Sequence, residues 1–147
     1  MLIQVVLGTV LIILTILIAA GGFWIAETVI TRANPWLLRR SHAPRLVMVL
    51  IGSVFVVLSA MTASVWLWAF AFVHLGVFDT LEPATYFSLV AFTTLGFGDI
   101  LLPEQWRILG GMTAANGLLN IGLYTALLVE SLRRVRSEQV RGRVDER

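Results

Sequence analysis

The stretch Thr93–Asp99, which reads Thr-Thr-Leu-Gly-Phe-Gly-Asp, combines residue types that could hold a bare metal cation. Moving a cation from water into an apolar environment costs on the order of tens of kcal/mol unless oxygen atoms replace its water. Successive backbone carbonyls can supply these oxygens if all of them point to one side, which an ordinary strand does not allow. Gly96 and Gly98 adopt the unusual backbone angles that this requires at low steric cost. The hydroxyl of Thr94 adds one more oxygen, so the stretch is a candidate cation site.

The segments that position this stretch are those of a membrane protein. The chain has 147 residues, 58% of them hydrophobic, and its mean hydropathy is +0.87. A run of about 20 apolar residues suffices to cross a bilayer, and long apolar runs cover residues 2–30, 46–75 and 108–132. The run 84–92 is too short to cross and is predicted to be a re-entrant helix. The fold class is therefore predicted to be all-α and integral to the membrane.

The charged residues predict how the chain is oriented. All 11 basic residues are arginines, and most lie in the connector 31–45 or in the tail 133–147. Basic loops stay in the cytoplasm, so both segments are predicted to be cytoplasmic, with two crossings between them. The N-terminus and the mouth of the re-entrant loop then lie outside a plasma membrane of the bacterial inner-membrane kind. The first run is predicted to be a retained helix, because it lacks the basic start of a signal peptide.

The Thr93–Asp99 string, with apolar runs on both sides, resembles the pore-domain family of potassium channels. The filter of those channels is a ring of four Thr-Val-Gly-Tyr-Gly loops; here Leu95 replaces the usual Val, and Phe97 the usual Tyr. The missing hydroxyl at Phe97 bears on the rigidity of the filter. The resemblance covers residues 46–132 and implies an outer helix 46–75, a pore helix 84–92, a filter 93–99 and an inner helix 108–132. The segment 1–30 is then an additional N-terminal transmembrane helix, followed by the cytoplasmic loop 31–45, and the segment 133–147 is the cytoplasmic tail.

The resemblance also implies roles for single residues. The permeant ion K⁺ would bind to the carbonyls of Thr94, Leu95, Gly96 and Phe97, and Gly98 would complete the filter. The filter and its mouth would be supported by Thr93, Asp99, Tyr86 and Phe87. The inner cavity and gate would be formed by Gly117, Leu118, Ile121, Thr125 and Val129. Many family members carry an acid three residues before the first filter threonine, where this chain has Val90, so an acid-controlled closure of the filter is not expected.

Two features of the inner helix leave alternatives open. Gly117 falls where the family's inner helix often bends, but glycine at this position could equally serve close packing against a neighbour. Asn116 and Asn120 lie four residues apart, and either hydrogen-bond to another helix or form a ring that faces the cavity. The first span is expected to be a peripheral helix that packs on the outer helix.

The function expected from the resemblance is passive, potassium-selective conduction. One filter strand cannot surround an ion, so the working unit is expected to be a homotetramer. Membrane lipids are expected partners, with anionic lipid at Arg39, Arg40, Arg133 and Arg134. The alternatives are a weakly selective monovalent cation channel, a subunit of an active potassium transporter, or a non-conducting regulatory membrane subunit. The sequence shows no cluster with the spacing of a catalytic site, so no enzyme, organic cofactor or nucleic-acid partner is expected; without cysteine there is also no disulfide framework.

Overall fold

The computed structural model describes residues 1–37 and 43–145, with side chains described for residues 1–28, 47–130 and 132–133. The described part of the chain is helical and contains no strand. Its elements are α1 (Leu2–Leu37), α2 (Ala43–His74), α3 (Leu81–Phe92), the short 3₁₀ helix η1 (Glu104–Trp106) and α4 (Arg107–Asp145). Three of the described helices are long and apolar enough to cross a membrane, within Leu2–Thr28, Val47–His74 and Glu104–Glu130. The architecture is therefore that of an all-helical membrane protein.

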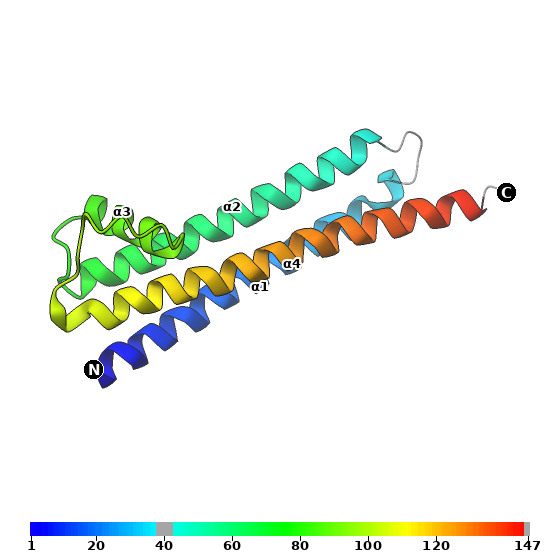
Figure 1. Cartoon of the computed structure of the whole chain (residues 1–147). Helices are drawn as coiled ribbons and strands as arrows, with labels where there is room; N and C mark the ends of the chain where they lie inside the picture. Colours follow the sequence, from blue (N-terminus) through cyan, green and yellow to red (C-terminus); the bar gives the residue numbers. More distant parts are fainter. Residues whose placement is uncertain (38–42, 146–147) are drawn as a thin grey trace.

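The three long helices lie side by side in an elongated bundle, with α1 and α4 running in one direction and α2 in the other (Figure 1). The short helix α3 and the loop that follows it lie at one end, beside α2 and α4, and the N-terminus lies at this same end. The C-terminal end of α4 lies at the opposite end. The 39 residues of α4 make a helix about 58 Å long at 1.5 Å per residue. Since the hydrocarbon core is about 30 Å thick, α4 extends well beyond it.

Several helix boundaries differ from those that the sequence predicts. α1 continues to Leu37 rather than ending near residue 30, because Pro35 removes only one hydrogen-bond donor close to the end of the helix. α2 begins at Ala43 rather than residue 46, so residues 31–37 and 43–45 of the predicted loop are helical, while residues 38–42 lie outside the described residues. α3 begins at Leu81 rather than residue 84, since Pro83 fits within a first helical turn.

The tail also differs from its prediction as a separate segment. α4 continues without a break from the inner helix through Asp145, so residues 133–145 are helical. This segment contains five arginines, which are good helix formers, and no proline. Residues 146–147 lie outside the described residues.

The core lies at the end of the bundle that carries α3. Trp68 and Phe72 of α2 are fully buried, as are Phe92 of α3 and Leu109 of α4. Leu11 of α1 belongs to the same cluster. Because side chains from all four α-helices meet here, this cluster fixes the position of α3 and of the loop after it.

Candidate functional site

The backbone of the loop after α3 alternates in handedness at every second residue. The φ angles of Thr94, Gly96 and Gly98 are 59°, 57° and 76°, whereas Leu95 and Phe97 between them have negative φ. A backbone of alternating handedness turns every second peptide plane over, which brings like groups of successive peptides to one side. An extended strand with negative φ throughout cannot do this. The loop therefore has the kind of backbone that a row of one-sided carbonyls needs.

Thr94 adopts its left-handed angle because it caps α3. Its N–H donates to the carbonyl of Ala91 at 2.9 Å, and the N–H of Leu95 donates to the carbonyl of Val90 at 3.0 Å. These two bonds define a Schellman motif, in which the left-handed residue is usually glycine. Among the described residues, Thr94 is the one non-glycine with positive φ. A β-branched residue is strained at this angle, so capping of α3 does not by itself account for a threonine here.

The last turn of α3 holds the start of the loop. The backbone N–H and the hydroxyl of Thr93 both donate to the carbonyl of Leu89, at 2.9 and 2.8 Å. The carbonyl of Val90 accepts from Leu95 and, at 3.4 Å, from Gly96. Carbonyls that would otherwise lack a partner at a helix end are thus used to anchor the loop. The loop begins as a continuation of the helix cap.

The far end of the loop is tied back to α3 by a side-chain hydrogen bond. The hydroxyl of Tyr86 donates to Oδ2 of Asp99 at 2.6 Å. This bond lowers the pKa of Asp99 and raises the pKa of Tyr86, since it favours the carboxylate and the protonated phenol. The structure thus brings together two residues that the sequence assigned to filter support. With the bonds at Thr93 to Gly96, the loop is held to α3 at both of its ends.

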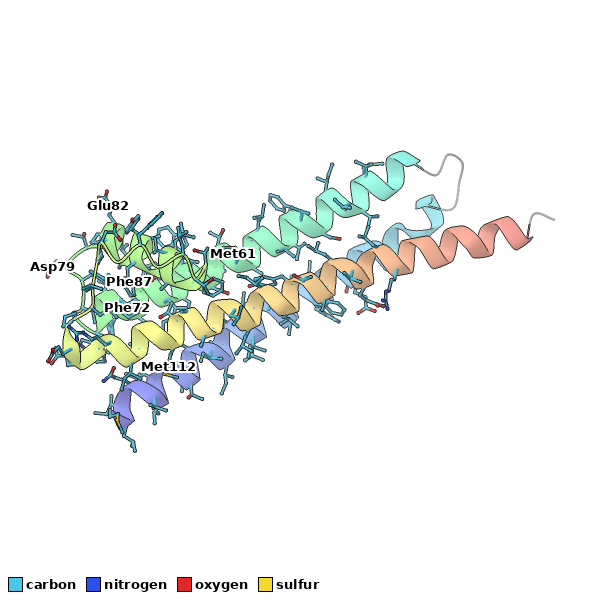
Figure 2. The ribbon with its side chains drawn as sticks, viewed as in Figure 1. Met61, Phe72, Asp79, Glu82, Phe87 and Met112 are labelled. Carbon is cyan, nitrogen blue, oxygen red and sulfur yellow. The ribbon has the colours of Figure 1, made fainter. Side chains whose placement is uncertain are left out.

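Phe87, the second aromatic residue assigned to filter support, points to α2. Its ring lies 5.4 Å from that of Phe72 at an interplanar angle of 87°, an edge-to-face contact, and 5.7 Å from that of Phe78. Figure 2 shows Phe72 and Phe87 close together at the end of the bundle. Phe87 therefore fixes α3 against α2, while Tyr86 holds the loop.

A cavity of about 320 Å³ lies behind the loop, between α3 and α4. Val90 and Ala91 of α3, Ala114 of α4 and the Tyr86–Asp99 pair contribute to its walls. Val90 stands at the position where related pores often carry an acid, and here it gives the cavity an apolar wall. The cavity contains no second carboxylate that could compete with Asp99 for Tyr86.

Gly117 lies where α4 passes the end of α3. A Cβ built on Gly117 would overlap the carbonyl oxygen of Phe92 and lie 2.5 Å from the carbonyl carbon. Since both of these are backbone atoms, no side-chain rotation could relieve the overlap. Of the two explanations that the sequence left open for Gly117, close packing is therefore directly observed.

Four of the five residues assigned to the inner cavity and gate share one side of α4, whereas Gly117 is buried against α3. Leu118, Ile121, Thr125 and Val129 are all exposed in the single chain. The opposite side of the helix is buried and includes Thr113, Asn116, Asn120, Tyr124 and Leu127. The spacing of three and four residues thus gives one free face and one packed face. The free face is available to a partner or to a central water-filled space.

Asn116 and Asn120 face α1 rather than the free side of α4. The hydroxyl oxygen of Thr15 lies 2.8 Å from Oδ1 of Asn116, and Nδ2 of Asn120 donates to this hydroxyl at 3.3 Å. Interhelical hydrogen bonding is therefore confirmed for both asparagines, and the alternative of a cavity-facing ring is wrong. Thr15 was not predicted as the partner of these asparagines, although a polar residue within so apolar a run indicates a polar contact with another helix.

α1 packs against both α2 and α4. Besides Thr15, Gln4 reaches α4 and accepts a hydrogen bond from the backbone N–H of Leu109 at 3.3 Å. On the other side, a Cβ on Gly22 would lie 3.3 Å from Val56 of α2. The expectation that α1 packs on the outer helix is confirmed at α2, and its buried polar residues bind α4 as well.

Of the arginines assigned to lipid, Arg39 and Arg40 lie outside the described residues, as does the side chain of Arg134. Arg133 is exposed and lies in the last third of α4.

The comparison with known proteins gives one match. A family model described as "Ion channel" matches residues 45–134, which span α2, α3, the loop and the first two-thirds of α4. No curated protein and no solved structure matches the chain. The matched residues are more than half of the chain and contain the loop with alternating handedness. The chain therefore belongs to the ion-channel family, with a two-helix pore of the potassium-channel type and one additional N-terminal helix.

Proposed function

We propose that this ion channel conducts K⁺ selectively and passively, through a filter made by residues 94–98. The observation that carries the proposal is the alternation of φ at Thr94, Gly96 and Gly98. Rings of backbone carbonyls replace the water of K⁺ in filters of this kind. In the proposed path, the ion meets the carbonyls of Thr94, Leu95, Gly96 and Phe97, and the Thr94 hydroxyl at the inner end. Gly98 allows the chain to leave the filter toward Asp99.

The proposed working unit is a homotetramer. In the single chain, Leu95, Phe97 and Leu101 are 57%, 66% and 74% exposed. Apolar side chains that gather on one exposed loop call for a covering surface, which copies of the chain around a central axis provide. The same assembly lets four loops share one ion. The free face of α4, with Leu118, Ile121, Thr125 and Val129, then lines the path below the filter.

The proposed orientation places the loop outside the cell. The N-terminus and the loop lie at one end of the bundle, and the arginine-rich end of α4 lies at the other. The positive-inside rule assigns the arginine-rich end to the cytoplasm. In this orientation, Arg133, with Arg39, Arg40 and Arg134, is available to anionic headgroups of the inner leaflet of a plasma membrane.

The nearest alternative is a channel with weak selectivity among monovalent cations. It is favoured by the two departures from the usual filter string, Leu95 and Phe97. Without a tyrosine hydroxyl at position 97, the bond between Tyr86 and Asp99 carries more of the support of the filter. The two candidates therefore differ in how rigid the filter stays during conduction.

The test is conduction by purified protein in planar bilayers, with K⁺ on one side and Na⁺ on the other. Potassium selectivity predicts a reversal potential far from zero and block by Ba²⁺, with no need for ATP or a proton gradient. A reversal potential near zero would establish the weakly selective channel instead. Flux that requires ATP or a proton gradient would favour a transporter subunit, and no flux in any condition would favour a non-conducting regulatory subunit.

A further inference from the structure

The single turn of α4 that contains Gly117 is bonded at both of its ends to one residue of α1. Asn116 precedes Gly117 by one residue, and Asn120 follows it by three. Oδ1 of Asn116 lies 2.8 Å from the hydroxyl oxygen of Thr15, and Nδ2 of Asn120 lies 3.3 Å from the same oxygen. Nδ2 of Asn120 also donates to Oδ1 of Asn116 at 2.8 Å and to its backbone carbonyl at 3.0 Å. These bonds join three side chains into one network around the glycine, in which Nδ2 of Asn116 and Oδ1 of Asn120 are buried without a partner.

The network is fully removed from solvent. Thr15, Asn116 and Asn120 each have an exposed fraction of 0%. The hydroxyl proton of Thr15 has two possible acceptors, Oδ1 of Asn116 and the carbonyl of Ile12, each at 2.8 Å. Nδ2 of Asn120 has two protons for three acceptors, of which the Thr15 hydroxyl is the most distant at 3.3 Å. The network therefore links α1 to α4 most directly when Thr15 donates to Asn116.

Two further contacts fix the position of α1 along α4 and so hold Thr15 opposite the asparagines. Gln4 accepts from the N–H of Leu109 in the first turn of α4, where N–H groups lack partners in their own helix. A Cβ on Gly8 would lie 2.6 Å from Cε of Met112, so α1 passes very close to α4 there (Figure 2). α1 thus contacts α4 at Leu109, Met112 and the asparagines, over more than two turns. Thr15 is held opposite Gly117 by the packing of the whole helix.

We infer that Thr15 is a positioning residue that splints α4 across Gly117, so that α1 sets how readily the inner helix bends. This inference rests on the proposed conduction through residues 94–98, and it takes Gly117 as a bend in α4 as well as a packing contact. Bending a helix at a glycine swings the residues before it away from those after it. When Thr15 donates to Asn116 and accepts from Asn120, the two asparagines cannot separate without breaking one of these bonds, in addition to the direct bond between their side chains. Bending of α4 therefore requires that the network open.

The splint explains a role for the one transmembrane helix that lies outside the residues matched to the ion-channel family. Thr15 also allows bending of α4 at Gly117 to be tested separately from the packing of Gly117 against Phe92. A side chain at that position would strike Phe92, so a substitution of Gly117 disturbs the end of α3 as well as any bend. Changing Thr15 alters the cost of bending while the contact between Gly117 and Phe92 stays intact.

The experiment compares Thr15→Val with wild type in single-channel recordings of purified protein in planar bilayers. Valine has the shape of threonine without its hydroxyl. Interhelical hydrogen bonds in membranes are weak, so the equilibrium between bent and straight α4 should shift by about threefold per subunit, and by about eightyfold if four subunits bend together. With bending as the opening motion, open probability rises by that factor, while unitary conductance and reversal potential stay as in wild type.

Two variants serve as controls. Thr9→Val removes a hydroxyl from the exposed side of the same helix, which bonds only to the carbonyl of Val5 among the described contacts, and should leave open probability unchanged. Thr15→Ser restores the hydroxyl and should return open probability to the wild-type value. Restoration by serine separates the bond from general packing, because serine lacks the methyl group and keeps only the oxygen.

The inference is overturned if Thr15→Val matches Thr9→Val, or if it lowers open probability. If Thr15→Val does not assemble, Asn120→Ala removes the same bond from α4 and is recorded in its place. A wild-type open probability in that variant, or its failure to assemble as well, would overturn the splint in favour of a purely structural network. Absence of current from wild type would instead count against the proposed function.

Discussion

Gly117 and Phe92 meet backbone to backbone, where the inner helix α4 passes the end of α3. The space that a Cβ of residue 117 would need is taken by the carbonyl group of Phe92. Phe92 is the last residue of α3, and Thr93 and Thr94 follow it directly into the loop that is proposed as the filter. The position of this loop is therefore coupled to the absence of one side chain on α4.

We expect Gly117→Ala to destabilise the protein by about 3 kcal/mol, the upper range for overpacking, because a backbone carbonyl cannot move aside as a side chain can. Thermal unfolding in detergent and recovery of current measure the effect. Gly52→Ala is the matched control, since Gly52 lies within the long helix α2 and a Cβ there meets nothing within 4 Å. Equal unfolding temperatures in the two variants would contradict the contact.

Tyr86→Phe removes the hydrogen bond to Asp99 while the aromatic ring stays in place. We expect the protein to assemble and to conduct, but with a filter that loses its conducting shape sooner. The current should decline several-fold faster during sustained opening, and the ratio of K⁺ to Na⁺ permeability should fall. Asp99→Asn keeps an acceptor for the hydroxyl and should be milder. Identical decay in wild type and Tyr86→Phe would show that the bond does not support the filter.

The same pair predicts how conduction depends on external pH. The bond holds the pKa of Asp99 below its ordinary value of 3.8 and that of Tyr86 above its ordinary value of 10.0. A carboxylate with a lowered pKa gives stabilisation that is complete above the ordinary value and is lost as the pH falls through the lowered one. The support from this pair should therefore persist from about pH 5 to 9. Permeability ratios measured at both limits should agree; a loss already at pH 5 would contradict the pairing.

The C-terminal caps of α2 and α3 have the same geometry but different residues. Both helices end in a Schellman motif, with Gly76 at φ 67° after α2 and Thr94 at φ 59° after α3. Left-handed angles cost a non-glycine residue about 1 kcal/mol. We expect Gly76→Ala to lower the free energy of unfolding by about this amount, although its Cβ meets nothing within 4 Å.

Thr94→Gly should change stability and function in opposite directions. It relieves the left-handed strain, so the unfolding temperature should stay the same or rise, whereas loss of the hydroxyl should weaken ion selectivity and Ba²⁺ block. Thr94→Ser keeps the hydroxyl and should retain selectivity. Full selectivity in Thr94→Gly would show that the hydroxyl is not part of the ion path.

Local features of the sequence were sufficient for the membrane class, the three apolar spans and the end of the pore helix at Phe92. Each depends on neighbouring residues alone, because hydrophobic length decides whether a helix can cross a membrane and closely spaced glycines decide where the backbone can alternate. The helix boundaries were less predictable. Pro35 and Pro83 were expected to lie outside or near the ends of helices, and the helices include both.

Only the tertiary structure decided what the polar residues within the spans do. Thr15 meets Asn116, and Gln4 meets Leu109, across more than 100 positions of sequence, and neither residue carries a local sign of its partner. The same holds for Gly117, whose neighbour Phe92 lies on another helix. Local sequence determines which helices form and how long they are, because hydrogen bonding and hydrophobic burial act along each segment. The pairing of their faces depends on shape and polar contacts that exist only once the helices are packed together.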